Sequence, residues 1–192
     1  SAASDVYKRQ EAGDGLFVAY FVNNTTLKRQ AGEYLATRPA VMLIAVDTYD
    51  EILKEMKESD RARVAGEIDL ALEQFIGATT GFLRRISASR YIAVVEERHM
   101  QEIVKNRFSI LDKVREIGEE AGTVTLSIGV GRLAATLREG EAMAVQALDM
   151  ALGRGGDQAA VKSAEGFEFY GGVSRSVEKR SKVKSRIIAS AL

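Results

Sequence analysis

The apolar run Val-Met-Leu-Ile-Ala-Val, residues 41–46, is the stretch that decides the fold of this chain. An unbroken apolar run of strand length is typical of a strand that is covered on both faces. We therefore expect it at the centre of a sheet. Two short β runs, residues 82–86 and 91–95, indicate a hairpin, and residues 124–130 form a further strand between glycines. Weaker strands are expected at residues 158–162 and 167–170.

Helical patterns fill the intervals between these strands. Apolar residues in the segment 60–77 recur at three- and four-residue spacing, which predicts a helix with one buried stripe. Residues 100–117 are predicted to form one long helix, which Gly118 ends. The order of strands and helices indicates an α+β fold, with a central sheet flanked by helices and related to the ferredoxin-like split βαβ arrangement. Further helices are expected at residues 27–37, 49–57, 141–152 and 174–191.

The composition is that of a globular protein. The chain has 192 residues, of which 46% are hydrophobic and 28% charged, with 27 basic and 27 acidic residues. This length predicts one main domain with short attachments, and the composition excludes disorder and collagen-like or coiled-coil structure for the whole chain. The absence of cysteine excludes disulfide scaffolds and thiolate metal sites. The longest apolar run, residues 40–46, is far shorter than the about 20 residues that cross a bilayer, so we expect a soluble chain.

Both ends of the chain are expected to be attachments. Residues 1–10 show no periodic pattern, and we interpret them as an engineered or assembly junction outside the fold. The strand-like run at residues 16–22 has no evident partner strand before it, which favours the end of a domain that begins upstream. Residues 175–186 contain six basic residues and one acidic residue. Such a run fits a solvated helix face better than a phosphate or lipid contact.

Three segments resemble the GGDEF nucleotidyl-cyclase family. They are the strand Val-Thr-Leu-Ser-Ile-Gly-Val-Gly at residues 124–131, the helix end and turn Ala-Leu-Asp-Met-Ala-Leu-Gly-Arg-Gly-Gly-Asp at residues 147–157, and the hairpin at residues 85–95. The resemblance extends over about residues 41–170. It implies a GGDEF, or nucleotidyl-cyclase-like, fold.

The positions that carry cyclase chemistry in that family hold other residues here. The signature pentapeptide aligns with residues 87–91, Ser-Ala-Ser-Arg-Tyr, so both glycines are replaced and Arg90 stands where an acid holds metal. The first metal-binding Asp of the family aligns with Ala45, Asp47 matches its second acid, and Gly156 replaces a phosphate-contacting lysine. A cation in place of a carboxylate repels Mg²⁺. We therefore expect no catalytic residue, no metal site and no cyclase activity.

The same departures, together with residues 153–162 and 169–192, resemble the GdpP-type cyclic-di-AMP phosphodiesterases. In that membrane-anchored bacterial family a degenerate GGDEF domain lies between a PAS domain and a DHH phosphoesterase domain. The resemblance implies that the parent protein lies at the cytoplasmic side of the membrane and hydrolyses cyclic-di-AMP with Mn²⁺ in a domain absent here, so this segment needs no cofactor. It implies three parts: residues 11–38 as the end of the PAS domain and a connecting helix, 39–172 as the degenerate GGDEF domain, and 173–192 as a linker helix.

Five residues are candidates for nucleotide contact: Asp47, Arg90, Arg154, Gly155 and Gly156. The turn at residues 153–156 could offer N–H groups and a guanidinium to a phosphate, or it is only the end of a helix. Arg90 could pair with a phosphate or with a neighbouring carboxylate. Asp47 is either a functional acid at a strand end or a helix cap. His99, the only histidine, is interpreted as a capping or surface residue.

Three functional hypotheses follow. The leading one is a regulatory, non-catalytic domain that transmits PAS and membrane signals to the phosphodiesterase domain through the helix at residues 174–191. The second is a domain that binds ATP or GTP weakly with residual ATPase activity. The third and least favoured is an active diguanylate cyclase. The expected partners are the adjacent PAS and DHH domains of the same chain. A homodimer is left open, and no nucleic acid partner is expected.

Overall fold

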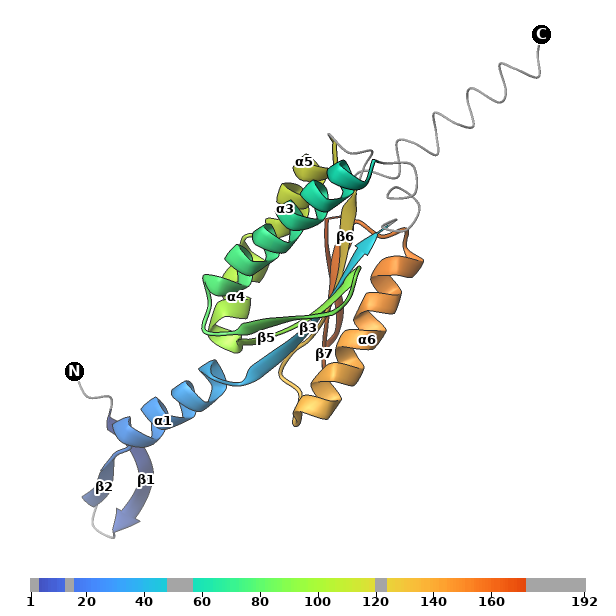
Figure 1. Ribbon diagram of the computed structural model, residues 1–192. Coiled ribbons are helices and arrows are strands. Elements are labelled where there is room, and N and C mark those ends of the chain that lie inside the picture. Colours follow the sequence, from blue (N-terminus) through green and yellow to red (C-terminus); the bar gives the residue numbers. More distant parts are fainter. Residues whose placement is uncertain (1–3, 13–15, 48–56, 120–123, 172–192) are drawn as a thin grey trace. The chain divides into compact units, whose positions relative to one another are not determined.

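The computed structural model describes residues 4–12, 16–47, 57–119 and 124–171 (Figure 1). The chain divides into two units, Ser1–Arg38 and Pro39–Leu192. The helices expected at residues 49–57 and 174–191 lie outside the described residues, except for Lys57. Within the described residues, no helix combines the length and the apolar character needed to cross a membrane.

The first unit contains a hairpin and a helix. Strand β1 (Ser4–Ala12) pairs antiparallel with β2 (Leu16–Asn23), and helix α1 (Thr25–Ala36) follows. The expectation that residues 16–22 lack a preceding partner strand is therefore wrong, whereas the interpretation of residues 1–10 as a junction stays a prediction. The mostly polar sequence of β1 hid its strand character, because backbone pairing satisfies N–H and C=O groups whatever the side-chain pattern.

A six-stranded sheet in the order β4-β5-β3-β6-β7-β8 forms the centre of the second unit. The central position predicted for residues 41–46 is confirmed, since β3 lies between β5 and β6 and most of its side chains are buried. The neighbouring pairs are antiparallel except for β6 with β7. The strands are β3 (Pro39–Asp47), β4 (Phe82–Ser87), β5 (Arg90–Glu96), β6 (Thr125–Gly131), β7 (Gln158–Ser163) and β8 (Gly166–Gly171).

Helices cover both faces of this sheet (Figure 1). Helices α3 (Glu58–Gly77), α4 (Glu97–Lys105) and α5 (Ile110–Glu119) lie on one face, and α6 (Leu137–Gly153) lies on the other. The α+β class predicted from the order of elements is confirmed. The main core lies between the sheet and the first three helices; its largest buried side chains include Met42, Ile44, Ile68, Leu72, Ile76, Met100, Phe108, Leu126 and Ile128.

The single helix expected at residues 100–117 is in fact two helices, α4 and α5. Arg107 and Phe108 adopt positive φ angles of 50° and 55°, which an α-helix cannot include. The break lets the Phe108 ring enter the core, where its centroid lies 5.3 Å from the centroid of the Tyr170 ring. Burial, together with the hydrogen bond to Glu168, raises the pKa of the Tyr170 phenol above its usual value. The apolar spacing hid the break because Phe108 is buried in either arrangement.

Helix α6 begins earlier than the expected residue 141 because its first turn is capped. The Thr136 hydroxyl accepts a hydrogen bond from the Glu139 N–H at 3.1 Å, and a Glu139 carboxylate oxygen accepts from the Ala135 N–H at 2.7 Å. This reciprocal pattern closely resembles a capping box and satisfies N–H groups that the helix itself leaves unpaired.

Two glycines in β6 let the backbone of α6 pack directly against the backbone of this strand. A Cβ atom added at Gly129 would lie 2.3 Å from both the Ala144 carbonyl oxygen and the Leu148 nitrogen. A Cβ atom at Gly131 would lie 2.1 Å from the Gly140 carbonyl oxygen. The Ile-Gly-Val-Gly sequence therefore sets the distance between the sheet and α6.

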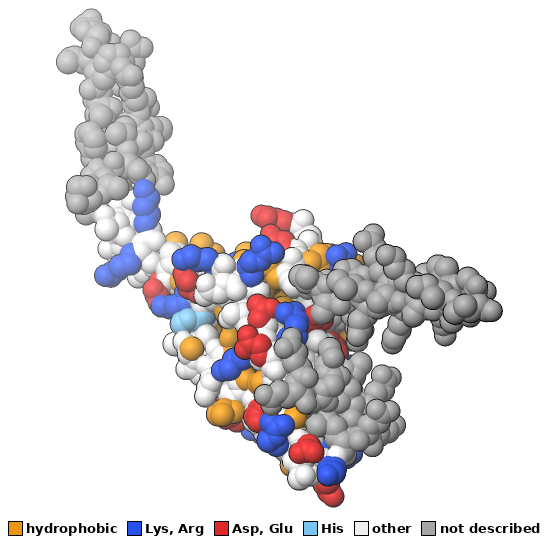
Figure 2. All heavy atoms as spheres, turned by 90° about the horizontal axis from the view of Figure 1, so that it is seen from above, with side chains coloured by type: hydrophobic (Ala, Val, Ile, Leu, Met, Phe, Trp, Pro, Cys, Tyr) orange, Lys and Arg blue, Asp and Glu red, His pale blue; other side chains and the backbone are white. Residues whose placement is uncertain are grey.

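The surface carries charges of both signs. On the face shown in Figure 2, basic and acidic side chains of the described residues are interspersed with apolar ones. The most basic run of the sequence, residues 175–186, lies outside the described residues.

We predict that Gly129→Ala lowers the free energy of unfolding by about 2 kcal/mol, since overpacking a close contact typically costs 1–3 kcal/mol. Urea denaturation of the purified chain measures the change. Gly66→Ala is the matched control, because the space around this exposed position in α3 is open and alanine should raise the free energy by about 0.5–1 kcal/mol. Equal stability of the two variants would contradict the close approach of α6.

Candidate functional site

One end of the sheet gathers polar residues from several strands. Asp47 is the last residue of β3, Thr125 begins β6 and Gln158 begins β7. The tip of the β4–β5 hairpin lies at the same end, because the Val46 N–H donates to the Ser89 carbonyl oxygen at 2.9 Å. The antiparallel register thus brings candidate residues of distant segments to one edge.

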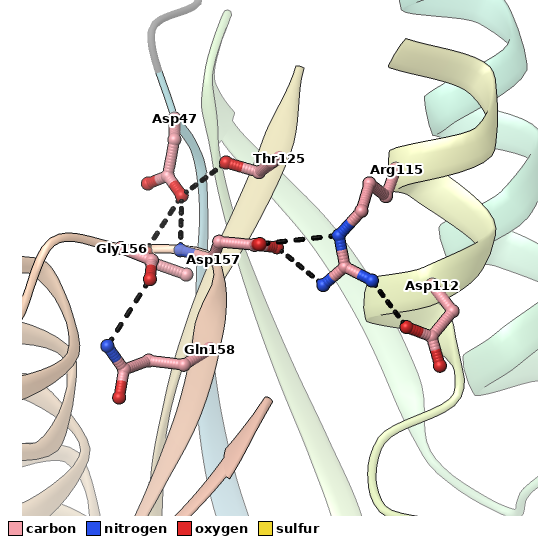
Figure 3. A network of polar contacts seen from close by, with 8 residues as sticks. Asp47, Asp112, Arg115, Thr125, Gly156, Asp157 and Gln158 are labelled. Atoms are coloured by element: carbon pink, nitrogen blue, oxygen red, sulfur yellow. Dashed lines mark hydrogen bonds and ion pairs between the residues drawn. The ribbon is translucent and has the colours of Figure 1, made fainter. Parts of the chain in front are cut away.

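Asp47 is a structural anchor at this edge. One of its carboxylate oxygens, Oδ2, accepts hydrogen bonds from Thr125 Oγ1 at 2.9 Å and from the Asp157 N–H at 2.9 Å (Figure 3). The same oxygen accepts a third hydrogen bond from Ser127 Oγ at 3.0 Å. The residue is only 7% exposed. Three donors on one oxygen stabilise the buried carboxylate and tie β3 to β6 and to the turn before β7.

The turn at residues 153–156 uses its N–H groups to end α6. Arg154 N–H donates to Met150 O at 3.2 Å, Gly155 N–H to Leu152 O at 2.9 Å and Gly156 N–H to Ala151 O at 3.0 Å. Of the two interpretations of this turn, its geometry therefore supports the helix cap.

Gly156 is required at its position for two reasons. Its φ angle is +75°, which favours glycine. In addition, a Cβ atom there would lie 2.8 Å from Asp47 Oδ2. The Arg154 guanidinium lies over the Phe169 ring, 4.2 Å from its centroid, and Nε donates to Gln158 Oε1 at 3.2 Å. Arg154 is thus already engaged within the domain.

An ion pair that the sequence analysis did not find extends this network. The Asp157 carboxylate, 1% exposed, accepts from Arg115 Nη2 at 2.9 Å and from Arg115 Nε at 3.3 Å. Arg115 also pairs with Asp112, one turn earlier on α5 (Figure 3). The hydrogen bond to Asp157 is the main cause that raises the pKa of the Arg115 guanidinium. The pairing joins residues 42 positions apart, so no local pattern predicts it.

Arg90 occupies the first position of β5, directly opposite Ala45 of β3. On its other side, Ala45 lies opposite Ser127 of β6. The Arg90 side chain is exposed and forms no ion pair with another described residue. The sheet thus places side by side the two positions that the sequence resemblance aligns with metal-binding acids of the cyclases.

The described residues bring together no cluster of three Asp, Glu or His side chains able to hold a metal ion. Asp47 is the one acid of the expected pattern at this edge, and its Oδ2 atom is already bound by three donors. Divalent cations such as Mg²⁺ need several oxygen ligands, and a guanidinium beside them is repulsive. The described residues of this edge therefore do not fit a divalent metal.

Arg85 braces the hairpin that carries Arg90. Its guanidinium donates to Asp69 Oδ2 at 2.9 Å, to Ser87 O at 3.1 Å and to Ala88 O at 2.9 Å. Tyr91 donates from its hydroxyl to the other Asp69 oxygen at 2.5 Å. None of residues 87–90 has a positive φ angle, so this turn does not require the glycines of the family signature.

His99 lies in the first turn of α4 and contacts the segment before β4. Its Nε2 atom lies 3.3 Å from the Thr80 nitrogen and 3.1 Å from Thr80 Oγ1. His99 is partly exposed and contacts Thr80, and its interpretation as a capping or surface residue stays a prediction.

A family model described as "Cyclic-di-AMP phosphodiesterase GdpP-like, GGDEF domain" matches residues 44–169. The chain belongs to this GdpP-like GGDEF family. Its relatives include the cyclic-di-AMP phosphodiesterases GdpP of Geobacillus thermodenitrificans, 37% identical over 175 residues, and of Bacillus subtilis, 36% identical over 189 residues. These alignments cover 90% and 97% of this chain but 27% and 28% of the relatives. The chain spans about a quarter of their length.

Solved GGDEF domains have the same fold as this GdpP-like domain. The active GGEEF domain of a diguanylate cyclase from Vibrio cholerae aligns with a TM-score of 0.53 at 17% identity, over 72% of this chain and 90% of that one. The GGDEF domain of DgcB from Caulobacter crescentus, in complex with c-di-GMP, aligns with a TM-score of 0.52 at 16% identity, over 74% and 88% of the two chains. The GGDEF fold expected from the sequence is confirmed.

We predict that Arg115→Met destabilises the domain by about 3 kcal/mol, because it leaves the Asp157 carboxylate buried without its cation. The double variant with Asp157→Asn should regain part of this loss, since no buried charge remains. Chemical denaturation of the single and double variants measures the coupling.

Arg63→Ala serves as the control, because the Arg63–Glu67 pair is exposed and should contribute less than about 0.5 kcal/mol. If Arg115→Met were as mild as Arg63→Ala, the buried pair would not have the structural role assigned to it.

Proposed function

We propose that this chain is a regulatory, non-catalytic GGDEF-like module of a longer cyclic-di-AMP phosphodiesterase. Membership of the GdpP-like family and the names of the curated relatives support the parent activity. In this proposal, Mn²⁺-dependent hydrolysis takes place in a DHH phosphoesterase domain outside the chain, and a PAS domain precedes the module. The parent protein is anchored at the cytoplasmic side of the bacterial membrane.

The observation that carries the non-cyclase part of the proposal is the pairing of Ala45 with Arg90. A cyclase of the expected pattern needs carboxylates at both positions to hold a metal ion beside the substrate phosphates. Here the two positions hold alanine and arginine, and the buried Asp47 carboxylate accepts hydrogen bonds that hold strands together. A phosphoryl-transfer reaction that depends on metal charge is poorly supported by these residues.

The sheet also offers a physical route for coupling. Strand β3 begins at Pro39 and ends at Asp47, and β8 ends at Gly171 opposite Gln158. Input from the segment before Pro39 and output through the segment after Gly171 would therefore act at opposite ends of one hydrogen-bonded sheet. The buried network of Asp47, Asp157 and Arg115 lies beside the proposed output end.

Weak binding of ATP or GTP is a second candidate function. The turn at residues 153–156 supports it poorly, since its N–H groups are used by α6. The tip of the β4–β5 hairpin supports it better, because Arg90 is exposed there beside two serines.

We predict that the purified chain forms no cyclic dinucleotide from GTP, with either Mg²⁺ or Mn²⁺, because the described residues offer no cluster of acidic side chains to hold the ion. Chromatography of the reaction products detects cyclisation, and an active GGEEF domain run in parallel is the positive control. Formation of c-di-GMP by this chain would overturn the non-cyclase assignment.

We predict that Asp157→Asn changes cyclic-di-AMP hydrolysis by the full-length parent at least threefold. Asparagine tolerates the positive φ angle of 55° but removes the charge that orients Arg115, so the output end of the sheet is loosened without loss of the fold. Hydrolysis rates of membrane preparations, normalised to protein amount, give the comparison. Arg63→Ala should leave the rate unchanged, and an unchanged rate for Asp157→Asn would argue against coupling through this network.

A further inference from the structure

We propose that two copies of this domain pair about a two-fold axis through a self-complementary surface formed by strands β4 and β5 and one flank of helix α6. The inference goes beyond the proposed function, because it concerns the assembly of the module and neither its chemistry nor its coupling. Three observations carry it: a sheet face without a covering helix, an exposed apolar flank of α6, and unpaired charges of opposite sign on the two borders of the surface.

On the side of the sheet that carries α6, none of the described helices packs against β4 and β5. Helix α6 packs against β3, β6 and β7 (Figure 1). Side chains alternate along a strand, and Tyr91, Ala93 and Val95 of β5 belong to the core on the other side. Ile92 and Val94 therefore lie on the side of α6, where they are only half-buried.

Strand β4 continues this face to the edge of the sheet. Phe82 lies opposite Val94 and Arg84 lies opposite Ile92, so both side chains of β4 share the side of their partners. Phe82 is 58% exposed. We call Phe82, Arg84, Ile92 and Val94 the open face. An apolar patch of this kind beside a charged rim is typical of an interaction surface.

The flank of α6 next to the open face is apolar as well. The other flank is directed towards β7 and β8, since Gln146 contacts Lys162 and Phe169 packs against Ala147. With 3.6 residues per turn, the flank towards β5 carries Val145 and Leu152, which are 44% and 37% exposed.

The two borders of this surface carry opposite charges. Arg84 on β4 is exposed and forms no ion pair with another described residue. Glu141 and Asp149 lie on α6, four residues before and four residues after Val145. They are exposed too, and neither has an ion-pair partner among the described residues. One copy therefore offers a cation on one border and acids on the other.

A two-fold axis parallel to the strands satisfies both borders at once. It lays α6 of each copy over β4 and β5 of the other, so that the two helices lie side by side between two sheets. A helix about 10 Å wide matches the two strands that it would cover. Arg84 then meets the acids of the partner's α6, and this contact occurs twice because both copies use the same surface.

Charge favours this arrangement over pairing of two copies through the edges of their β4 strands. Antiparallel pairing of β4 with a second β4 would bring Arg84 and Arg85 close to the same arginines of the other copy. Like charges directly opposite each other destabilise a strand pair. The same arginine that protects the edge is thus attracted to a second copy only through the acidic helix.

Sedimentation equilibrium of the 192-residue chain at micromolar to millimolar concentrations tests the inference. We expect a reversible equilibrium between monomer and dimer. Arg84→Glu and Asp149→Arg should each weaken the dimer at least about tenfold, because each change places like charges at two symmetric points. An equimolar mixture of the two variants should dimerise again, since the mixed pair brings opposite charges together at both points.

Glu73→Arg is the matched control, because Glu73 is an exposed acid on α3, which covers the opposite side of the sheet. Its dimer should be as stable as that of the unchanged chain, and thermal unfolding verifies that every variant is folded. A chain that stays monomeric at all concentrations would leave the open face to another segment of the parent protein and would overturn the inference. So would a dimer that neither Arg84→Glu nor Asp149→Arg weakens, or a mixture of these variants that stays monomeric.

Discussion

A single carboxylate oxygen, Oδ2 of Asp47, holds together the edge of the sheet at which β3 ends. It accepts hydrogen bonds from the side chains of two residues of β6 and from the backbone N–H just before β7. Without these donors, burial of the carboxylate would cost free energy. The requirement for glycine at position 156 follows from it, because a side chain there would occupy the space of the carboxylate. The left-handed backbone of Asp157 follows as well, since that conformation directs its N–H to Asp47 and its side chain to Arg115. Within the described residues, Asp47 thus has a structural role at the end of β3.

Much of the fold could be predicted from local patterns. The apolar run of β3, the hairpin of β4 and β5 and the amphipathic α3 each carry their own signal, because burial on one or two faces determines which residues they contain. The division between α4 and α5 could not be predicted in this way. It depends on two residues with positive φ angles, and their spacing is compatible with a continuous helix. Strand β1 was missed because its partner, rather than its own side chains, stabilises it.

The candidate site was predictable only in part, and for a related reason. Family resemblance pointed to Ala45, Asp47 and Arg90, and strand register then explains why the three lie at one edge. The roles of Arg115 and Arg85 were not predictable, since each acts through contacts with segments distant in sequence. For the turn at residues 153–156 the sequence permitted both a phosphate site and a helix cap. Only the destination of each N–H group distinguishes these interpretations.

The contact between α6 and β6 has a mechanical consequence. A layer of side chains usually separates a helix from a sheet, and rotamer changes in that layer let the helix shift by small amounts. At Gly129 and Gly131 this layer is missing, so the backbone of α6 packs directly against the backbone of β6. The glycines leave no room for a side chain at these two points, so the close contact depends on this register of α6 against β6. Movement of α6 relative to β6 is therefore sterically restricted at these two positions.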